Sequence, residues 1–275
     1  MAVALSPPVT SRKARGVSQP WLPLLALPIL LFLTLPLLAL VLRIRIPMLL
    51  ANLANPAVVQ ALSLSLTTAG LSTLAALLFG TPLAYWLARH QFRGREVIDT
   101  LIDLPMVLPP SVAGIALLMA FGRRGLLGGY LQEWGLSLAF TQAAVILAQI
   151  FVAAPFYVKA AIAGFGGVER DLEQAAAIDG ANAWRIFRYI TAPLAWPVLF
   201  GGAVMTWARS LGEFGATIIF AGNFPGRTQT MPLAIYIGFE LELTVALTLS
   251  VILLALSFLV LFVVKGLLRQ RLGAM

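Results

Sequence analysis

Cysteine is absent from this 275-residue chain, and histidine occurs only once, as His90. Disulfides, thiolate nucleophiles and cysteine metal sites are therefore excluded, and one histidine cannot supply a Ser/His/Asp set or a histidine-rich metal cluster. We expect His90, which follows Arg89 at the end of an apolar segment, to be an interfacial residue. No GxxxxGK[ST] phosphate loop occurs, so no nucleotide site of that kind is encoded. These absences predict a chain that is not an enzyme and holds no metal.

Charged residues are also scarce. They make up 11% of the chain, against about 25% in soluble domains, whereas 60% of the residues are hydrophobic. A soluble core cannot absorb that much apolar surface, so we predict an all-α integral membrane protein surrounded by lipid. The net charge of +8 suggests nucleic acid at first sight. In a membrane protein its commoner cause is cytoplasmic Lys and Arg that fix the orientation, and we expect no nucleic-acid partner.

Long apolar runs predict about six transmembrane helices. The segments are approximately 21–42, 58–88, 104–121, 143–163, 194–221 and 244–264. Residues 1–20 are Ser/Pro-rich and basic, which predicts a disordered cytoplasmic tail. A basic segment before an apolar run also describes a signal peptide, but this run is longer than a usual signal core and no clear cleavage site follows it. We therefore predict a retained first helix (21–42), a membrane-embedded core (58–265) and a cytoplasmic tail (266–275).

Six spans place both termini on one side of the membrane. That side collects most of the 19 lysines and arginines. By the positive-inside rule, both termini and the segment between the fourth and fifth spans are cytoplasmic.

That segment, 171–193, reads DLEQAAAIDGANAWRIFRYITAP. Apolar residues at helical spacing predict a short amphipathic helix, and Gly180 follows it where a left-handed cap ends a helix. A second short helix, Ala183–Ile190, is expected to end at Pro193. Helices this short need support, which suits docking to a partner. The alternative is a loop with two amphipathic turns that rest on lipid headgroups.

The fifth predicted span contains two charges, Arg209 and Glu213, at a spacing that lets them pair on a helix face. The pair either braces the bundle or marks a pathway; in the second case the guanidinium suits a tetrahedral oxyanion. Gly212 and Gly215 flank the glutamate and permit close packing or a helix break. We include Thr217 with Arg209 and Glu213 as candidate pathway residues. The polar loop that follows, AGNFPGRTQTMP, either meets a binding protein or caps the bundle.

The segment 171–193 resembles the cytoplasmic loop of bacterial ABC-importer permeases, which reads E-A-A, three residues, G, nine residues, I-x-L-P. Gln174 stands for the glutamate and Ala192 for the leucine, while Glu173 lies one residue from the acidic position. In that family the loop occupies a groove of the ATPase subunit. The resemblance therefore implies that a set of residues couples this chain to an ATPase: Glu173, Gln174, Ala175, Ala176, Asp179, Gly180, Ile190 and Pro193.

Further segments resemble, in this order, the permeases of molybdate and sulfate importers: PLAYWLARHQFRGR, LPMVLPPSVAG, FGRRGLLG, LEQAAAIDGA, ARSLGEFGATIIFAGN and PGRTQTMP. GRRG and NFPGRTQTMP favour molybdate or tungstate over sulfate or thiosulfate. The resemblance implies a type I ABC-importer permease fold in the bacterial plasma (inner) membrane and alternating access. It also implies a homodimer, ATPase subunits that hold ATP and Mg, and a periplasmic or lipid-anchored oxyanion-binding protein.

Two other classes remain as alternatives. An ion-coupled secondary carrier needs no ATPase, but the E-A-A-like segment and the scarcity of intramembrane carboxylates disfavour it. A membrane-embedded enzyme or assembly factor is disfavoured because the sequence has no nucleophile, metal or acid/base cluster.

Overall fold

The computed structural model of the protein describes residues 21–272, so the predicted tail at 1–20 lies outside the described residues. Within 21–272 every regular element is a helix, which confirms the all-α prediction. Five helices are long and apolar enough to cross a membrane, and a bent pair raises the number to six. The predicted number of about six spans is therefore confirmed.

The chain divides into two units, 1–43 and 44–275. The first unit contains α1 (Leu22–Arg43), a helix of 22 residues with Pro28 and Pro36 inside it. Its large apolar side chains are exposed on all sides, as expected of a helix surrounded by lipid or by other helices. It occupies the position of the predicted first span.

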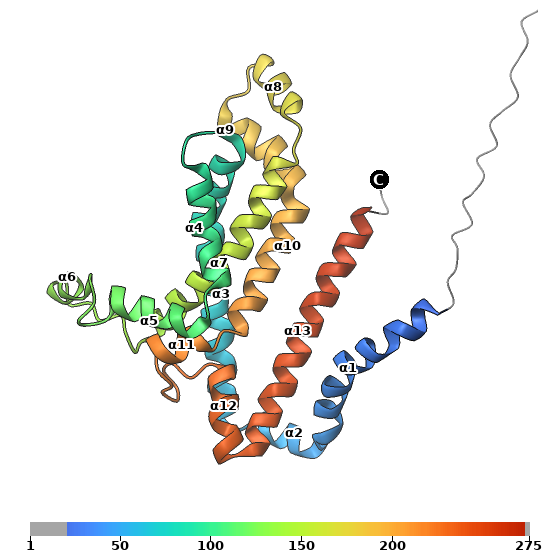
Figure 1. Cartoon of the computed structure of the whole chain (residues 1–275), viewed down its shortest axis with the longest axis vertical. Coiled ribbons are helices and arrows are strands. Elements are labelled where there is room, and N and C mark those ends of the chain that lie inside the picture. Colours follow the sequence, from blue (N-terminus) through green and yellow to red (C-terminus); the bar gives the residue numbers. More distant parts are fainter. Residues whose placement is uncertain (1–20, 273–275) are drawn as a thin grey trace, which may run out of the picture. The chain divides into compact units, whose positions relative to one another are not determined.

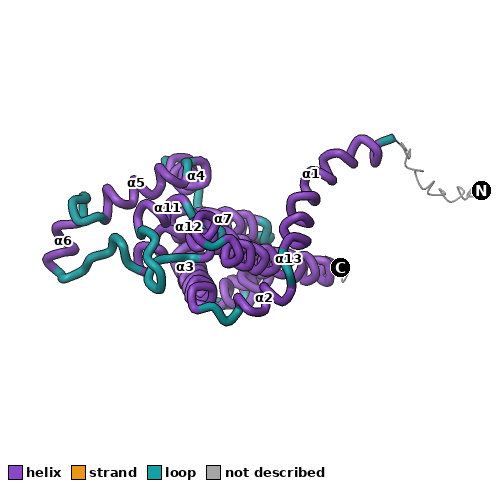
Figure 2. Tube along the Cα trace, turned by 90° about the horizontal axis from the view of Figure 1, so that it is seen from below, coloured by secondary structure: helices purple, strands orange, loops and turns teal. Residues whose placement is uncertain are grey.

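The second unit contains the remaining helices (Figure 1). Those of its first half are α2 (Ile46–Asn52), α3 (Pro56–Arg89), α4 (Arg95–Val107), α5 (Pro110–Phe121), α6 (Gly128–Glu133) and α7 (Gln142–Gly166). Those of its second half are α8 (Arg170–Ile178), α9 (Ala183–Ile186), the π-helix η1 (Phe187–Thr191), α10 (Ala192–Leu211), α11 (Gly215–Phe220), α12 (Met231–Leu241) and α13 (Leu243–Leu272). Within this unit α8 and α9 lie at one end and α12 lies at the other, while α6 lies at the edge in both views (Figure 2).

The centre of the second unit is formed by α3, α7 and α10. Small residues make the close packing possible: a Cβ on Gly202 of α10 would lie 2.6 Å from the Cβ of Ala160 on α7. Hydroxyl groups join the same helices, with Ser72 Oγ donating to Ser210 Oγ at 3.1 Å. Two ion pairs link α4 to α7. Lys159 Nζ of α7 lies 2.9 Å from carboxylate oxygens of both Asp99 and Asp103 of α4.

The third and fifth predicted spans are broken in the structure. The proline-rich start of the predicted span 104–121, LPMVLPP, is a sharp bend, because α4 and α5 meet there at an angle of 115°. Leu108, the residue before Pro109, has an extended conformation at this bend, and proline disfavours helix in the residue before it. The predicted span 194–221 also breaks, since α10 ends at Leu211 and α11 starts at Gly215.

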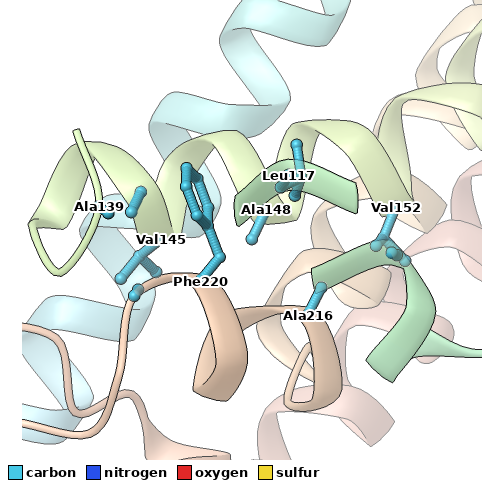
Figure 3. Close-up of a cluster of buried hydrophobic side chains, with 10 residues drawn as sticks. Leu117, Ala139, Val145, Ala148, Val152, Ala216 and Phe220 are labelled. Atoms are coloured by element: carbon cyan, nitrogen blue, oxygen red, sulfur yellow. The ribbon is translucent and has the colours of Figure 1, made fainter. Parts of the chain in front are cut away.

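The two broken spans pack against each other through glycines. A Cβ on Gly114 of α5 would lie 2.9 Å from the carbonyl oxygen of Ala216, and one on Gly215 would lie 2.6 Å from the Cβ of Pro110. Beside this crossing, Leu117 of α5, Phe220 of α11 and neighbouring residues of α7 form a buried apolar cluster (Figure 3). The glycine contacts therefore fix α5 and α11 as one packed unit beside α7.

Three short helices, α2, α6 and α12, were not predicted, because all three are shorter than a membrane span. The last helix, α13, continues to Leu272, beyond the predicted sixth span and into the segment 266–275 that we had treated as a tail.

Candidate coupling surface and charged pair

The turn after α8 has the hydrogen bonds of a Schellman cap. The Ala181 N–H donates to the Ala176 carbonyl at 2.9 Å, and the Gly180 N–H donates to the Ala177 carbonyl at 3.1 Å. Gly180 has φ of +85°, the left-handed conformation expected from its position. Asp179 is the last residue before it. The predicted glycine turn between two helices is thus present in the structure.

The helix after the turn differs from the prediction. Asn182 begins α9 by accepting a hydrogen bond from the Arg185 N–H at 2.9 Å, a cap that we had not predicted. The expected helix end at Pro193 is wrong, because α9 passes through η1 into α10 as one helical stretch, with Pro193 in the first turn of α10. Proline cannot donate the α-helical bond to the fourth residue before it, and the wider π turn accommodates that loss. Ile190 therefore lies within η1.

The outward surface of this region carries large apolar side chains. Ile178 is 86% exposed, Tyr189 70% and Trp184 64%. Gln174 and Ala175 of α8 are exposed beside them, whereas Ala176 is half-buried. We call the exposed set Leu172, Gln174, Ala175, Ile178, Trp184 and Tyr189 the coupling surface. Exposed apolar residues gathered at a helix turn are typical of a surface that another molecule covers.

Glu173 lies on the opposite face of α8 from this surface. Its Oε1 accepts hydrogen bonds from Arg89 Nη2 at 2.6 Å and from the Thr191 hydroxyl. We call Glu173, Arg89 and Thr191 the clasp. Sequence reasoning did not find Arg89 and Thr191 as partners, because they lie 84 and 18 residues from Glu173 and no local pattern links them.

Arg209 and Glu213 pair as predicted, although they do not share one regular helix. Arg209 is in the last turn of α10, and Glu213 lies in the break before α11; Arg209 Nη1 and Glu213 Oε2 are 2.8 Å apart. Glu213 Oε1 also accepts a hydrogen bond from the Ala216 N–H at 2.9 Å, so the carboxylate caps α11. The Glu213 side chain is 1% exposed and that of Arg209 is 31% exposed. Among the described residues, the buried Thr217 hydroxyl has no hydrogen-bond partner.

Several hollows lie along the second unit, among them the following two. One of about 330 Å³ is lined mainly by α3 and α7, with polar side chains from Gln60, Ser63, Thr67 and Gln142. Another of about 460 Å³ lies between the break in the fifth span, α12 and α13. The loop over residues 221–230 packs inward next to these elements: Thr228 and Thr230 are buried, and the Met231 N–H donates to Ser65 Oγ at 2.7 Å. This packing favours the cap over a loop that meets a binding protein.

Comparison with known proteins places these features in a family. Residues 80–273 match the family described as "Binding-protein-dependent transport system inner membrane component". The Mycobacterium tuberculosis protein named molybdenum transport system permease protein ModB is 42% identical over 240 residues, which cover 87% of this chain and 91% of that protein. The Escherichia coli K12 protein of the same name is 45% identical over 178 residues, which cover 64% of this chain and 78% of that protein.

Among solved structures, a bacterial ABC transporter involved in the import of the acidic polysaccharide alginate contains a chain of the same fold. Its TM-score is 0.68 at 18% identity, with 90% of this chain and 93% of that chain covered. At 18% sequence identity, this likeness is evidence for the fold alone. The family match spans more than half of the sequence. The chain therefore belongs to the binding-protein-dependent transport system inner membrane components, and it has the fold of an ABC-importer permease.

Proposed function

We propose that this chain is the permease subunit of an ATP-driven importer for molybdate or tungstate. The coupling surface is the observation that carries the permease role. It presents Ile178, Trp184 and Tyr189 at the end of the second unit where α8 and α9 lie, and burial of such side chains against a partner is favourable. The molybdate assignment is supported by relatives from two bacteria that are named as molybdenum permeases.

The partner proposed for the coupling surface is an ABC ATPase, which binds ATP and Mg and hydrolyses ATP outside this chain. In this assembly two permease copies form the pathway, each against one ATPase subunit. A periplasmic or lipid-anchored binding protein delivers the oxyanion to the opposite side. The permease itself carries no catalytic residue; binding of ATP draws the two ATPase subunits together, and the coupling surfaces move with them.

The proposed orientation places both termini and the coupling surface in the cytoplasm of a bacterial cell with the chain in its plasma membrane. The arginines in and next to the clasp support this side, because Lys and Arg are enriched in cytoplasmic segments. Arg89, Arg170, Arg185 and Arg188 all lie in or beside the coupling region.

Arg209 is the proposed contact for the oxyanion within the pathway. It is the more exposed member of its pair, and a guanidinium has donors that match the oxygens of a tetrahedral dianion. Thr217, whose buried hydroxyl has no partner among the described residues, lies on α11 just past the break. Glu213 neutralises Arg209 when no anion is present.

The assignment is tested by expressing the chain with its ATPase and binding protein in cells that lack their own molybdate permease. We expect the ATPase to co-purify and labelled molybdate to be taken up, with excess unlabelled tungstate as a stronger competitor than sulfate. Stronger competition by sulfate would identify a sulfate or thiosulfate permease. Uptake that persists without the ATPase and collapses with the ion gradient would identify an ion-coupled carrier and overturn the proposal.

A further inference from the structure

We propose that Glu173 works inside the permease, as the positioning residue that ties the coupling surface to two membrane helices, and does not contact the ATPase. This inference rests on the proposed function, because it concerns how movement of an attached ATPase reaches the pathway. The acidic residue at this end of α8 then has a mechanical role, while the neighbouring Gln174 faces outward.

The first observation is the position of the partners of Glu173. One carboxylate oxygen binds both Arg89 Nη2 and the Thr191 hydroxyl. Arg89 is the last residue of α3, and Thr191 is the last residue of η1, immediately before α10. A single oxygen on α8 therefore joins the ends of α3 and α10, two helices of the central trio.

The second observation is that the clasp is shielded from solvent. The side chains of Arg89 and Glu173 are 9% and 15% exposed, and Thr191 is buried. A charge pair in such surroundings is held more strongly than an exposed pair, because water screens it less. Glu173 cannot turn outward to a partner protein without leaving the Arg89 guanidinium uncompensated. The Glu173 carboxylate is thus held by partners within the permease.

The third observation is that Arg89 is itself held by its surroundings. The Arg89 guanidinium lies 5.9 Å from the centre of the Tyr85 ring, and Arg170 at the start of α8 donates to the Arg89 carbonyl at 3.3 Å. Tyr85 packs in turn against Phe187 of η1 at 5.1 Å between ring centres, and Phe165 of α7 joins both rings. These contacts hold Arg89 in a fixed position next to α8.

Displacement of α8 therefore acts on two helices at the same time. Through Arg89 it acts on α3, which lines the polar hollow at Gln60, Ser63 and Thr67. Through Thr191 it acts on α10, which carries Arg209 in its last turn. The attachment point on the α10 side is a π-helix, an element that often occurs at functional sites and whose backbone bonding differs from the flanking α-helix.

The test uses the purified permease–ATPase complex in proteoliposomes with the binding protein and molybdate. Thr191→Val removes the hydroxyl but keeps the shape, and Thr191→Ser restores the hydroxyl. Glu173→Gln removes the charge but keeps an acceptor oxygen. Asp171→Asn is the matched control, because Asp171 is an exposed acidic residue of the same helix. Two quantities are measured for each variant: the amount of ATPase that co-purifies, and the molybdate transported per ATP hydrolysed.

We expect Thr191→Val and Glu173→Gln to retain the bound ATPase and its hydrolysis, while molybdate transported per ATP falls by about fivefold or more, the lower end of typical coupling between sites. Thr191→Ser and Asp171→Asn should keep the wild-type ratio. If Glu173 contacts the ATPase instead, Glu173→Gln will reduce co-purification and Thr191→Val will leave the ratio unchanged, which overturns the inference. If the Glu173 variant is unstable, the Thr191→Val and Thr191→Ser pair decides alone.

The outcomes for the inference and for the proposed function are distinct. A wild-type chain that neither retains an ATPase nor transports molybdate would contradict the proposed function. A wild-type complex that transports, with a Thr191→Val variant of unchanged transport per ATP, would contradict only the clasp.

Discussion

Glu213 has two structural roles that a simple deletion of its side chain does not separate. One carboxylate oxygen caps α11 at the Ala216 N–H, and the other pairs with Arg209. A substitution that removes both oxygens therefore damages the break in the fifth span whether or not Arg209 meets an anion. The informative replacement is glutamine, whose amide oxygen still accepts from the Ala216 N–H but carries no charge.

We predict that Arg209→Met alone is destabilising, because it leaves the buried Glu213 carboxylate without its charge partner; since Arg209 is 31% exposed, the loss should lie below the about 3–5 kcal/mol typical of a fully buried pair. The Arg209→Met/Glu213→Gln double variant should recover most of the thermal stability, measured on the detergent-solubilised protein, yet fail to take up molybdate. The exposed loop residue Arg227 provides the control Arg227→Met, which should change neither stability nor uptake. If the double variant recovers uptake as well as stability, the pair has only a structural role and Arg209 does not contact the anion in the pathway.

At the scale of elements, the turn between α8 and α9 sets the geometry of the coupling surface. The Schellman bonds end α8, and Asn182 begins α9 two residues after Gly180. The Cβ of any replacement at Gly180 would meet no atom within 4 Å, so the cost is conformational and not steric crowding. Residues with a side chain in the left-handed conformation pay about 1–2 kcal/mol.

We predict that Gly180→Val leaves the chain in the membrane but abolishes ATPase association and uptake, because the backbone relaxes away from φ of +85° and α9 turns relative to α8. The control is Gly166→Val at the end of α7. Gly166 is also exposed and has open space around its Cβ, but it lies in a helix. Co-purification of the ATPase at the wild-type level with Gly180→Val would contradict the role of this turn.

The elements that sequence reasoning predicted well are those with strong local signals. The long helices α3 and α7 followed from apolar length, and the Gly180 cap followed from its position after an amphipathic repeat. Hydropathy records the length of an apolar run but not its direction, so the prolines of LPMVLPP indicated a break in the predicted span 104–121 but not its angle of 115°. The clasp could not be predicted, because Arg89 and Glu173 meet only through the packing of distant segments.

For the molecule as a whole, the proposed orientation follows from where the basic residues lie. It places Gly180 on the cytoplasmic side and the connection between α5 and α6, which contains the exposed Leu126, on the outer side. The chain contains no cysteine, so single cysteines report position without background.

We predict that Gly180→Cys resists an impermeant thiol reagent added to intact cells and reacts after the membrane is opened. Leu126→Cys should react in intact cells, which shows that the reagent reaches the outer surface. Labelling at position 180 from outside would show that the orientation is the reverse of the one proposed, and that the coupling surface does not face a cytoplasmic ATPase.

The central claim is that this chain imports molybdate through an ATPase bound at the coupling surface. Ile178 offers the most direct test, because its side chain is 86% exposed and a charged replacement there leaves the packing of the bundle intact. The measurement is molybdate accumulation in proteoliposomes that contain the permease and ATPase with ATP inside, and the binding protein with molybdate outside. The account predicts that wild-type vesicles accumulate molybdate only when ATP is present, and that Ile178→Glu vesicles lose the ATPase and the accumulation together. Accumulation without ATP, or undiminished accumulation by Ile178→Glu, would contradict it.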